Sequence, residues 1–161
     1  MASGGSSTKD LLNDFDERVR RFSPVVIFLM TEIHDCRKDS QATPETFSGN
    51  LRKLTEKCSA IQALPVFQTA CPVLPGSVPE RESYFLNYML AIHKIAKLQG
   101  IPLIDHTQYW LENPNKHSFW MSNEIYPNED GHREFAYFLL KELGQLDVNS
   151  PAQRITFLIA G

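Results

Sequence analysis

Short apolar segments alternate with amphipathic helices along most of this chain, and this alternation restricts the possible folds more than any other property of the sequence. The first apolar segment, Val25 to Met30, follows Pro24 without a polar interruption. Such a run is typical of a strand that is buried on both faces. Residues 64–69 and 101–105 are two further expected strands, and Pro102 predicts that the last one lies at or near a sheet edge.

Amphipathic helices are expected around these strands. Ser7 and Asp10 have the spacing of a capping box and predict a helix that ends before Pro24, with Phe15, Val19 and Phe22 on its apolar face. Later segments have apolar residues every three or four positions, which predicts helices with one buried face. The residues on these faces are Phe47, Leu51, Leu54, Cys58 and Ile61, then Phe85, Tyr88, Met89, Ile92 and Ile95, and finally Phe135, Leu139 and Leu143. Strands that alternate with helices predict an α/β fold, a three-layer sandwich whose parallel sheet is flanked by helices.

Composition sets the broad class of protein. The 161 residues correspond to one domain, and the hydrophobic content of 42% and charged content of 22% are ordinary for a globular protein. The net charge of −3 comes from interspersed charges, so we expect no nucleic-acid partner. The apolar runs are too short to cross a bilayer and no leader pattern is evident, which predicts a cytoplasmic protein without a membrane partner. The spacing of the three cysteines favours buried thiols, and we expect neither a metal nor a cofactor.

Polar residues follow each expected strand, where parallel α/β sheets place their ligands. These strand exits are residues 32–36, 70–71 and 105–106, and the turn 123–126 is expected at the same rim. Within the first exit, His34 and Asp35 form either an imidazole–carboxylate pair or an ordinary polar loop cluster. Asp105 either lines the rim or caps the following turn.

The segment from Asn123 to His132 resembles the closing motif of the SGNH (GDSL-type) hydrolases, which reads Asp-x-x-His-Pro-Asn-x-x-Gly-His. Pro127, Asn128, Gly131 and His132 match this motif. In that family the Asp and the His complete a catalytic triad with a serine. Here Asn123 stands at the Asp position and Tyr126 at the His position, so the resemblance implies the scaffold of the motif without its catalytic groups. It also implies the flavodoxin-like sandwich of that family.

Two further blocks extend the resemblance towards the N-terminus. The exit of the first strand is similar to the family's Gly-x-Asn-Asp block, with Asp35 at the matching Asp, Glu32 at the glycine and His34 at the asparagine that donates to the oxyanion. The glycine that supplies a second oxyanion N–H corresponds to Gly5. A carboxylate at position 32 has the wrong sign for a site that receives an oxyanion. Glu32, Asp35 and Gly161 are expected at the rim.

The family's nucleophile block, a strand that ends in Gly-Asp-Ser, has no counterpart in the usual place, and Gly-Asp-Ser occurs nowhere in the chain. Residues 155–161, which end in Gly161, resemble that strand and follow a linker, residues 144–154. We therefore expect one SGNH-hydrolase-like domain over residues 1–161, with 155–161 in the position of the family's first strand, as in a circular permutation. Alternatively, residues 155–161 begin a second domain or pair with another chain.

Two functions follow from the resemblance. In the first, the polypeptide is catalytically inactive, a pseudo-hydrolase with a binding or scaffold role, because no acyl-enzyme can form without the triad. In the second, it is part of an active GDSL-type esterase or acetylesterase whose serine lies outside this chain. Either function implies a small ester or an acylated molecule as ligand, and the residues favour no particular oligomeric state.

Overall fold

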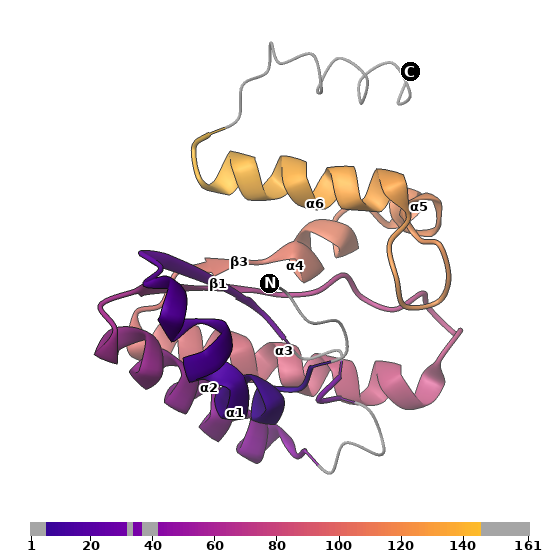
Figure 1. Ribbon diagram of the computed structural model, residues 1–161. Helices are drawn as coiled ribbons and strands as arrows, with labels where there is room; N and C mark the ends of the chain where they lie inside the picture. Colours follow the sequence, from indigo (N-terminus) through magenta and orange to yellow (C-terminus); the bar gives the residue numbers. More distant parts are fainter. Residues whose placement is uncertain (1–5, 32–33, 37–41, 146–161) are drawn as a thin grey trace.

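A parallel sheet with helices on both faces forms the centre of the protein (Figure 1). A computed structural model describes residues 6–31, 34–36 and 42–145. Within them, β1 (Val26–Met30), β2 (Leu64–Gln68) and β3 (Leu103–Ile104) lie in the order β1-β2-β3. Val26 pairs with Leu64 and Met30 with Gln68, while Phe67 and Gln68 pair with the two residues of β3. The predicted α/β sandwich is confirmed.

One face of the sheet is covered by α1 (Thr8–Arg18), α2 (Pro44–Ala60) and α3 (Pro79–Gln99), which Figure 1 shows together on one side. A short 3-10 helix, η1 (Arg20–Phe22), connects α1 to β1. The main hydrophobic core lies between these helices and the sheet. The predicted helix faces supply most of this core: Phe15, Phe47, Leu51, Leu54, Cys58, Phe85, Tyr88, Met89, Ile92 and Ile95.

The opposite face carries α6 (Glu129–Glu142), with the short helices α4 (His106–Leu111) and α5 (Pro114–His117) and the 3-10 helix η2 (Ser118–Trp120) near its start. A second, smaller cluster of buried residues lies here, formed by Cys71, Trp110, Trp120 and Met121, with Tyr109 and Phe135 packed against it. Phe119, in η2, is 75% exposed and does not belong to this cluster. No helix in the described ranges is both long and apolar enough to cross a membrane.

Side-chain caps fix where the helices begin. Ser7 and Asp10 form the predicted capping box of α1, since the Ser7 hydroxyl accepts from the Asp10 N–H and the Asp10 carboxylate accepts from the Ser7 N–H. Asp105 caps α4 by accepting from the Gln108 N–H, which confirms the capping alternative for this residue. Asn128 caps α6 through the Gly131 N–H.

Three sequence expectations are corrected. β1 is buried on one face only, because the core under α1–α3 covers Ile27 and Leu29, whereas Phe28 on the opposite face is 43% exposed. Phe22 lies outside α1, which already ends at Arg18, and is 58% exposed. The apolar face of α6 is only partly covered, and Leu143 is 41% exposed.

Candidate functional site

The carboxyl ends of the three strands form one rim, as expected for a parallel sheet. Met30 is paired with Gln68, and Gln68 with Ile104, so the residues that follow these three positions leave the sheet at the same edge. Thr31, Thr69 and Asp105 are the first residues beyond the strands. The loop from η2 to α6 and the start of α1 both reach this edge, and each contains residues that the sequence assigns to the site.

The loop from η2 to α6 is held by Asn128. Its side-chain nitrogen donates to the Phe119 carbonyl at 2.6 Å, its side-chain oxygen accepts from the Gly131 N–H at 3.0 Å, and its backbone N–H donates to the Trp120 carbonyl at 2.9 Å. Gly131 packs so closely that an added Cβ would lie 2.1 Å from the Trp120 carbonyl oxygen. Asn128 and Gly131, two matched residues of the family motif, therefore shape this loop.

Asn123 and Tyr126 lie within that loop. The Asn123 side-chain oxygen accepts from the N–H groups of Ile125 and Tyr126, both at 2.9 Å, which forms an Asx turn. Tyr126 is 50% exposed, and its carbonyl accepts from both the N–H and the hydroxyl of Ser122. Tyr126 is therefore held by its backbone and remains half exposed.

The Asn123–Tyr126 turn is fixed to the segment that follows β2. The Leu74 N–H donates to the Glu124 carbonyl at 2.9 Å, and the Cys71 thiol donates to the Ile125 carbonyl at 3.7 Å. Cys71 itself is buried, as expected. These contacts place the turn beyond the carboxyl end of β2, at the rim.

Asp35 connects the exit of β1 to the start of α1. Its two carboxylate oxygens accept from the Thr8 N–H at 2.9 Å and the Thr8 hydroxyl at 2.6 Å, and Asn50 donates to the same hydroxyl at 3.0 Å. Asp35 is 1% exposed, and burial raises the pKa of its carboxyl group while the bonds from Thr8 lower it. This carboxylate anchors two segments of chain, and its assignment to the rim stays a prediction.

Of the other residues assigned to the site, the structure describes His34, which lies at the exit of β1, next to Asp35, and is partly buried. Gly5, Glu32 and Gly161 lie outside the described residues, so their assignments stay predictions. The described residues thus contain two groups at one edge of the sheet, His34 with Asp35 on the β1 side and Asn123 with Tyr126 beyond β2.

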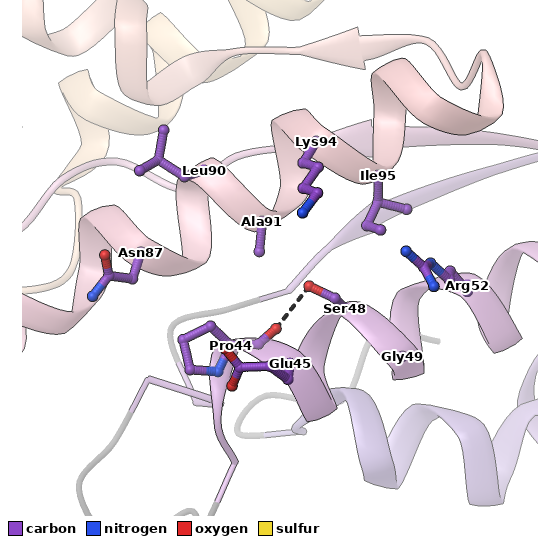
Figure 2. A pocket seen from close by; sticks show the side chains of 10 residues that line it. All are labelled: Pro44, Glu45, Ser48, Gly49, Arg52, Asn87, Leu90, Ala91, Lys94 and Ile95. Carbon is purple, nitrogen blue, oxygen red and sulfur yellow. Dashed lines mark hydrogen bonds between the residues drawn. The ribbon is translucent and has the colours of Figure 1, made fainter.

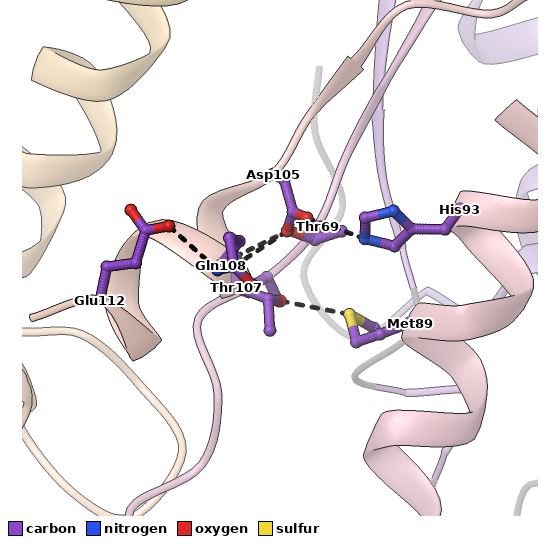
Figure 3. A network of polar contacts seen from close by, with 8 residues as sticks. Thr69, Met89, His93, Asp105, Thr107, Gln108 and Glu112 are labelled. Carbon is purple, nitrogen blue, oxygen red and sulfur yellow. Dashed lines mark hydrogen bonds and ion pairs between the residues drawn. The ribbon is translucent and has the colours of Figure 1, made fainter. Parts of the chain in front are cut away.

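A network between β2, β3 and α3 is the polar cluster that the sequence did not reveal (Figure 3). The Asp105 carboxylate accepts from the Thr69 hydroxyl at 2.9 Å and lies 2.8 Å from Nε2 of His93. The Thr69 hydroxyl in turn accepts from the Thr107 N–H at 2.8 Å. His93 belongs to α3, and its side chain is 46% exposed. Only the folded chain shows its partner, because 12 positions separate it from Asp105.

His106 is a buried imidazole on the α6 side of the rim. It is fully buried, its Nε2 lies 3.0 Å from the Gln68 side-chain oxygen, and its ring packs on Phe135 with centroids 4.3 Å apart. Its Nδ1 has no hydrogen-bond partner among the described residues. Burial lowers the pKa of His106 to about 4, so this ring is neutral at pH 7. Phe135 and Phe138 cover it, which gives it a packing role.

A groove of about 640 Å³ lies elsewhere, between α2 and α3 (Figure 2). Its floor contains the buried side chains of Ala91 and Ile95, and the charged groups of Glu45, Arg52 and Lys94 surround it. None of the residues that the sequence assigns to the site lines this groove. The helical layer therefore has a surface depression that is separate from the rim.

Comparison with known proteins identifies the class of fold. No family model matches the chain, and no curated protein matches its sequence. Solved structures do match. An acetyl xylan esterase matches at 19% identity, and the match covers 88% of this chain and 78% of the other with a TM-score of 0.77. A lipase/acylhydrolase from Enterococcus faecalis matches at 18% identity, covering 91% of this chain and 75% of the other with a TM-score of 0.78.

A protein described as a putative GDSL-like lipase, from Parabacteroides merdae, matches at 14% identity. The match covers 88% of this chain and 70% of the other with a TM-score of 0.80. The three neighbours agree on the architecture. The chain thus has a fold of the SGNH/GDSL hydrolase type, as the motifs around Asp35 and Asn128 predict. At these identities the likeness concerns the fold alone.

Proposed function

We propose that this polypeptide is a catalytically inactive protein of the SGNH hydrolase fold, a pseudo-hydrolase that binds a ligand at the rim. The observation that carries the proposal is the Asn123–Tyr126 turn. Its backbone conformation is held by the Asn123 side-chain oxygen and by Asn128, while both catalytic positions carry groups that cannot perform triad chemistry.

The chemistry of a serine triad requires a base that takes the hydroxyl proton and a carboxylate that stabilises the resulting imidazolium. Tyr126 has no basic nitrogen to accept that proton. Asn123 is uncharged, and its oxygen already accepts two backbone N–H groups. The Ser122 hydroxyl, which lies in the same loop, donates to the Tyr126 carbonyl and has no neighbouring base in the contacts of this turn. Without a base at position 126 no group takes the serine proton, and without a carboxylate at position 123 no group stabilises an imidazolium.

The proposed ligand is a small ester or an acylated molecule, and neither a nucleic acid nor a membrane partner. Support comes from the structural neighbours, which include acetyl xylan esterases and an acetyl-xylooligosaccharide esterase. An acetylated xylo-oligosaccharide is therefore the first probe to use. Titration followed by NMR should shift the amide signals of residues 123–126 and 34–36. Shifts confined to the α2–α3 groove would move the proposed site away from the rim.

Hydrolysis assays test the inactivity directly. With a short-chain p-nitrophenyl ester, we expect no turnover beyond that of a denatured control. A residual effect of ~10³-fold over water from a surviving oxyanion hole would stay below detection in such an assay. Turnover that rises with protein concentration and is abolished by a serine-directed phosphonate would refute the proposal.

Restoring single family residues gives a sharper test. Tyr126→His and Asn123→Asp should both leave the protein inactive, because triad members act as a unit and a base without a nucleophile has no serine to activate. The variants are matched to each other, since both change one side chain of the same turn. Appreciable esterase activity in either variant would show that a nucleophile is already present.

The second candidate is an active GDSL-type esterase whose serine lies outside this chain. It is favoured by the intact scaffold, in which Asn128, Gly131 and the Asp35–Thr8 pair are all engaged. A version extended by Asp-Ser after Gly161, combined with Tyr126→His and Asn123→Asp, tests this candidate. Labelling of the added serine by a phosphonate would support it, and an unlabelled but folded protein would favour the inactive form.

A further inference from the structure

We infer that residues 155–160, Ile-Thr-Phe-Leu-Ile-Ala, add to the sheet as a parallel strand along the outer edge of β1. These residues lie outside the described part of the chain, whereas the surface that would receive them is described. Their addition to the sheet requires neither catalysis nor the proposed ligand.

The outer edge of β1 is open and apolar. Among the described residues, β1 pairs with β2 on one side and with no strand on the other. On the face of the sheet where α6 lies, Val26, Phe28 and Met30 are 42%, 43% and 44% exposed. Leu64, which pairs with Val26, is 51% exposed. An exposed edge with this much apolar surface favours pairing with a further strand.

The hand of the crossovers indicates where the chain goes after α6. The connections from β1 to β2 and from β2 to β3 run through α2 and α3 on one face, and such crossovers are right-handed in nearly all proteins. α6 follows β3 on the opposite face (Figure 1). A crossover through a helix on the other face is right-handed only if the chain moves across the sheet in the opposite direction. A right-handed crossover through α6 therefore takes the chain back across β2 and β1. The first vacant position in that direction is the outer edge of β1.

The geometry of α6 and the length of the linker agree with this path. α6 begins beside the rim, where Asn128 contacts Trp120, and Figure 1 shows it running back over the sheet towards the end where the strands start. Three strand spacings of ~4.8 Å separate β3 from the vacant position, a distance of ~14 Å. Residues 144–154 form an 11-residue linker that reaches up to ~36 Å when extended. A strand that starts at this end would run parallel to β1.

Residues 155–160 have the apolar character that the position beside β1 requires. The six residues contain Ile155, Phe157, Leu158 and Ile159, and none is charged. The side chains on one face of such a strand would pack beside the exposed side chains of β1. They would also approach Leu140 of α6 and its C-cap residue Leu143, which are 40% and 41% exposed. Gly161 would then leave the sheet at the rim, on the same side as His34.

Amide hydrogen exchange in the full chain, followed by NMR, tests the inference. The Val25 carbonyl accepts from the Leu64 N–H, and successive backbone groups of a strand point to alternate edges. The N–H groups of Val26, Phe28 and Met30 therefore point to the outer edge, and those of Ile27 and Leu29 point to β2. We expect the outer set to exchange about 100-fold more slowly in the full chain than in a version that ends at Arg154. The inner set should stay protected in both.

Point variants keep the test valid if the shortened version does not fold. Phe157→Asp and Leu158→Asp should each abolish protection of the outer set, whereas the matched linker variant Asn149→Asp should leave it unchanged. Contacts between Hα and N–H protons of residues 155–160 and 26–30 in the wild-type monomer would locate the strand directly. Fast exchange of the outer set in a folded monomer would overturn the inference. So would protection that appears only when two copies associate.

Discussion

The two faces of the sheet are built on different principles. The face under α1–α3 is a continuous hydrophobic core in which Phe47 and Leu54 are fully buried. The face under α6 combines a small aromatic cluster around Trp110 with a buried histidine, and its β1 side leaves Phe28 43% exposed. Periodic side-chain packing defines the first face. Loops, caps and one close backbone contact define the second, which is also the face that borders the loop of the candidate site.

This difference shows where sequence variation is tolerated. On the α1–α3 face, apolar residues of similar volume substitute for one another at modest cost. On the α6 face, Asn128 makes specific hydrogen bonds and Gly131 leaves no room for a side chain, so each position accepts few alternatives. The two positions nearby that differ from the family motif, Asn123 and Tyr126, form a turn whose backbone bonds do not require catalytic groups.

The largest effect is expected from Gly131→Ala. The new Cβ would lie 2.1 Å from the Trp120 carbonyl oxygen and 2.7 Å from Pro127 Cβ, so the backbone of the loop has to move. We expect a loss of about 5 kcal/mol or more, enough to unfold a marginally stable domain. Gly49→Ala in α2 is the matched control on the other face: nothing lies within 4 Å of its Cβ, and it should stabilise by about 1 kcal/mol. If urea unfolding gave the same change in the free energy of unfolding for both substitutions, the two faces would not differ in their tolerance of an added side chain.

Phe47→Ala probes the hydrophobic core of the α1–α3 face. Phe47 is fully buried and packs edge-on against Tyr88, with ring centroids 5.0 Å apart, so truncation leaves a large cavity. The expected loss is about 3–5 kcal/mol in the free energy of unfolding. Phe22→Ala, at a position that is 58% exposed, serves as the control and should cost less than about 1 kcal/mol. A small effect at Phe47 would mean that this core is loosely packed.

Acid should weaken the α6 face through His106. Its pKa in the folded protein is lowered to about 4, below its ordinary value near 6.5, so the unfolded state binds more protons between these pH values. Stability from the neutral ring is present above pH 6.5 and is lost as the pH falls towards 4. The expected loss between pH 7 and pH 5 is about 2 kcal/mol.

His106→Gln is the control for this pH dependence, because it removes the titrating ring and should flatten that part of the stability profile. Burial also lowers the pKa of His117, which adds to the acid loss in the same direction. The raised pKa of Asp35 acts in the opposite direction. An unchanged profile in His106→Gln, measured by urea unfolding at both pH values, would assign the acid sensitivity to these other groups.

The smallest effect is expected at the turn itself. Asn123→Asp keeps an oxygen for both N–H groups, and Tyr126 is 50% exposed, so Tyr126→His removes little buried surface. Each variant should change the free energy of unfolding by less than about 0.5 kcal/mol. Thermal unfolding measures this directly, and a large loss in either variant would mean that the replaced residues have become part of the packing.

The sequence predicted most of the α1–α3 face. Buried positions on α2 and α3 recur every three or four residues, and this periodicity identified Phe47, Leu51, Phe85 and Ile92 as core residues. The capping box at Ser7 and the edge position of β3 were also readable, because local hydrogen bonding and the missing N–H of proline act within a few residues. The motif around Asn128 predicted the type of fold.

The tertiary structure alone decided which surfaces meet. An apolar run such as Val25 to Met30 reads the same whether one or both of its faces are covered, and only the folded chain shows that Phe28 lies on an exposed face. The His93–Asp105 pair and the anchoring of Asp35 by Thr8 join residues that are 12 and 27 positions apart. No local pattern encodes such pairs, because they form where two separately determined elements pack together. Sequence periodicity thus set the elements of this protein, and long-range packing set its polar contacts and its exposed edge.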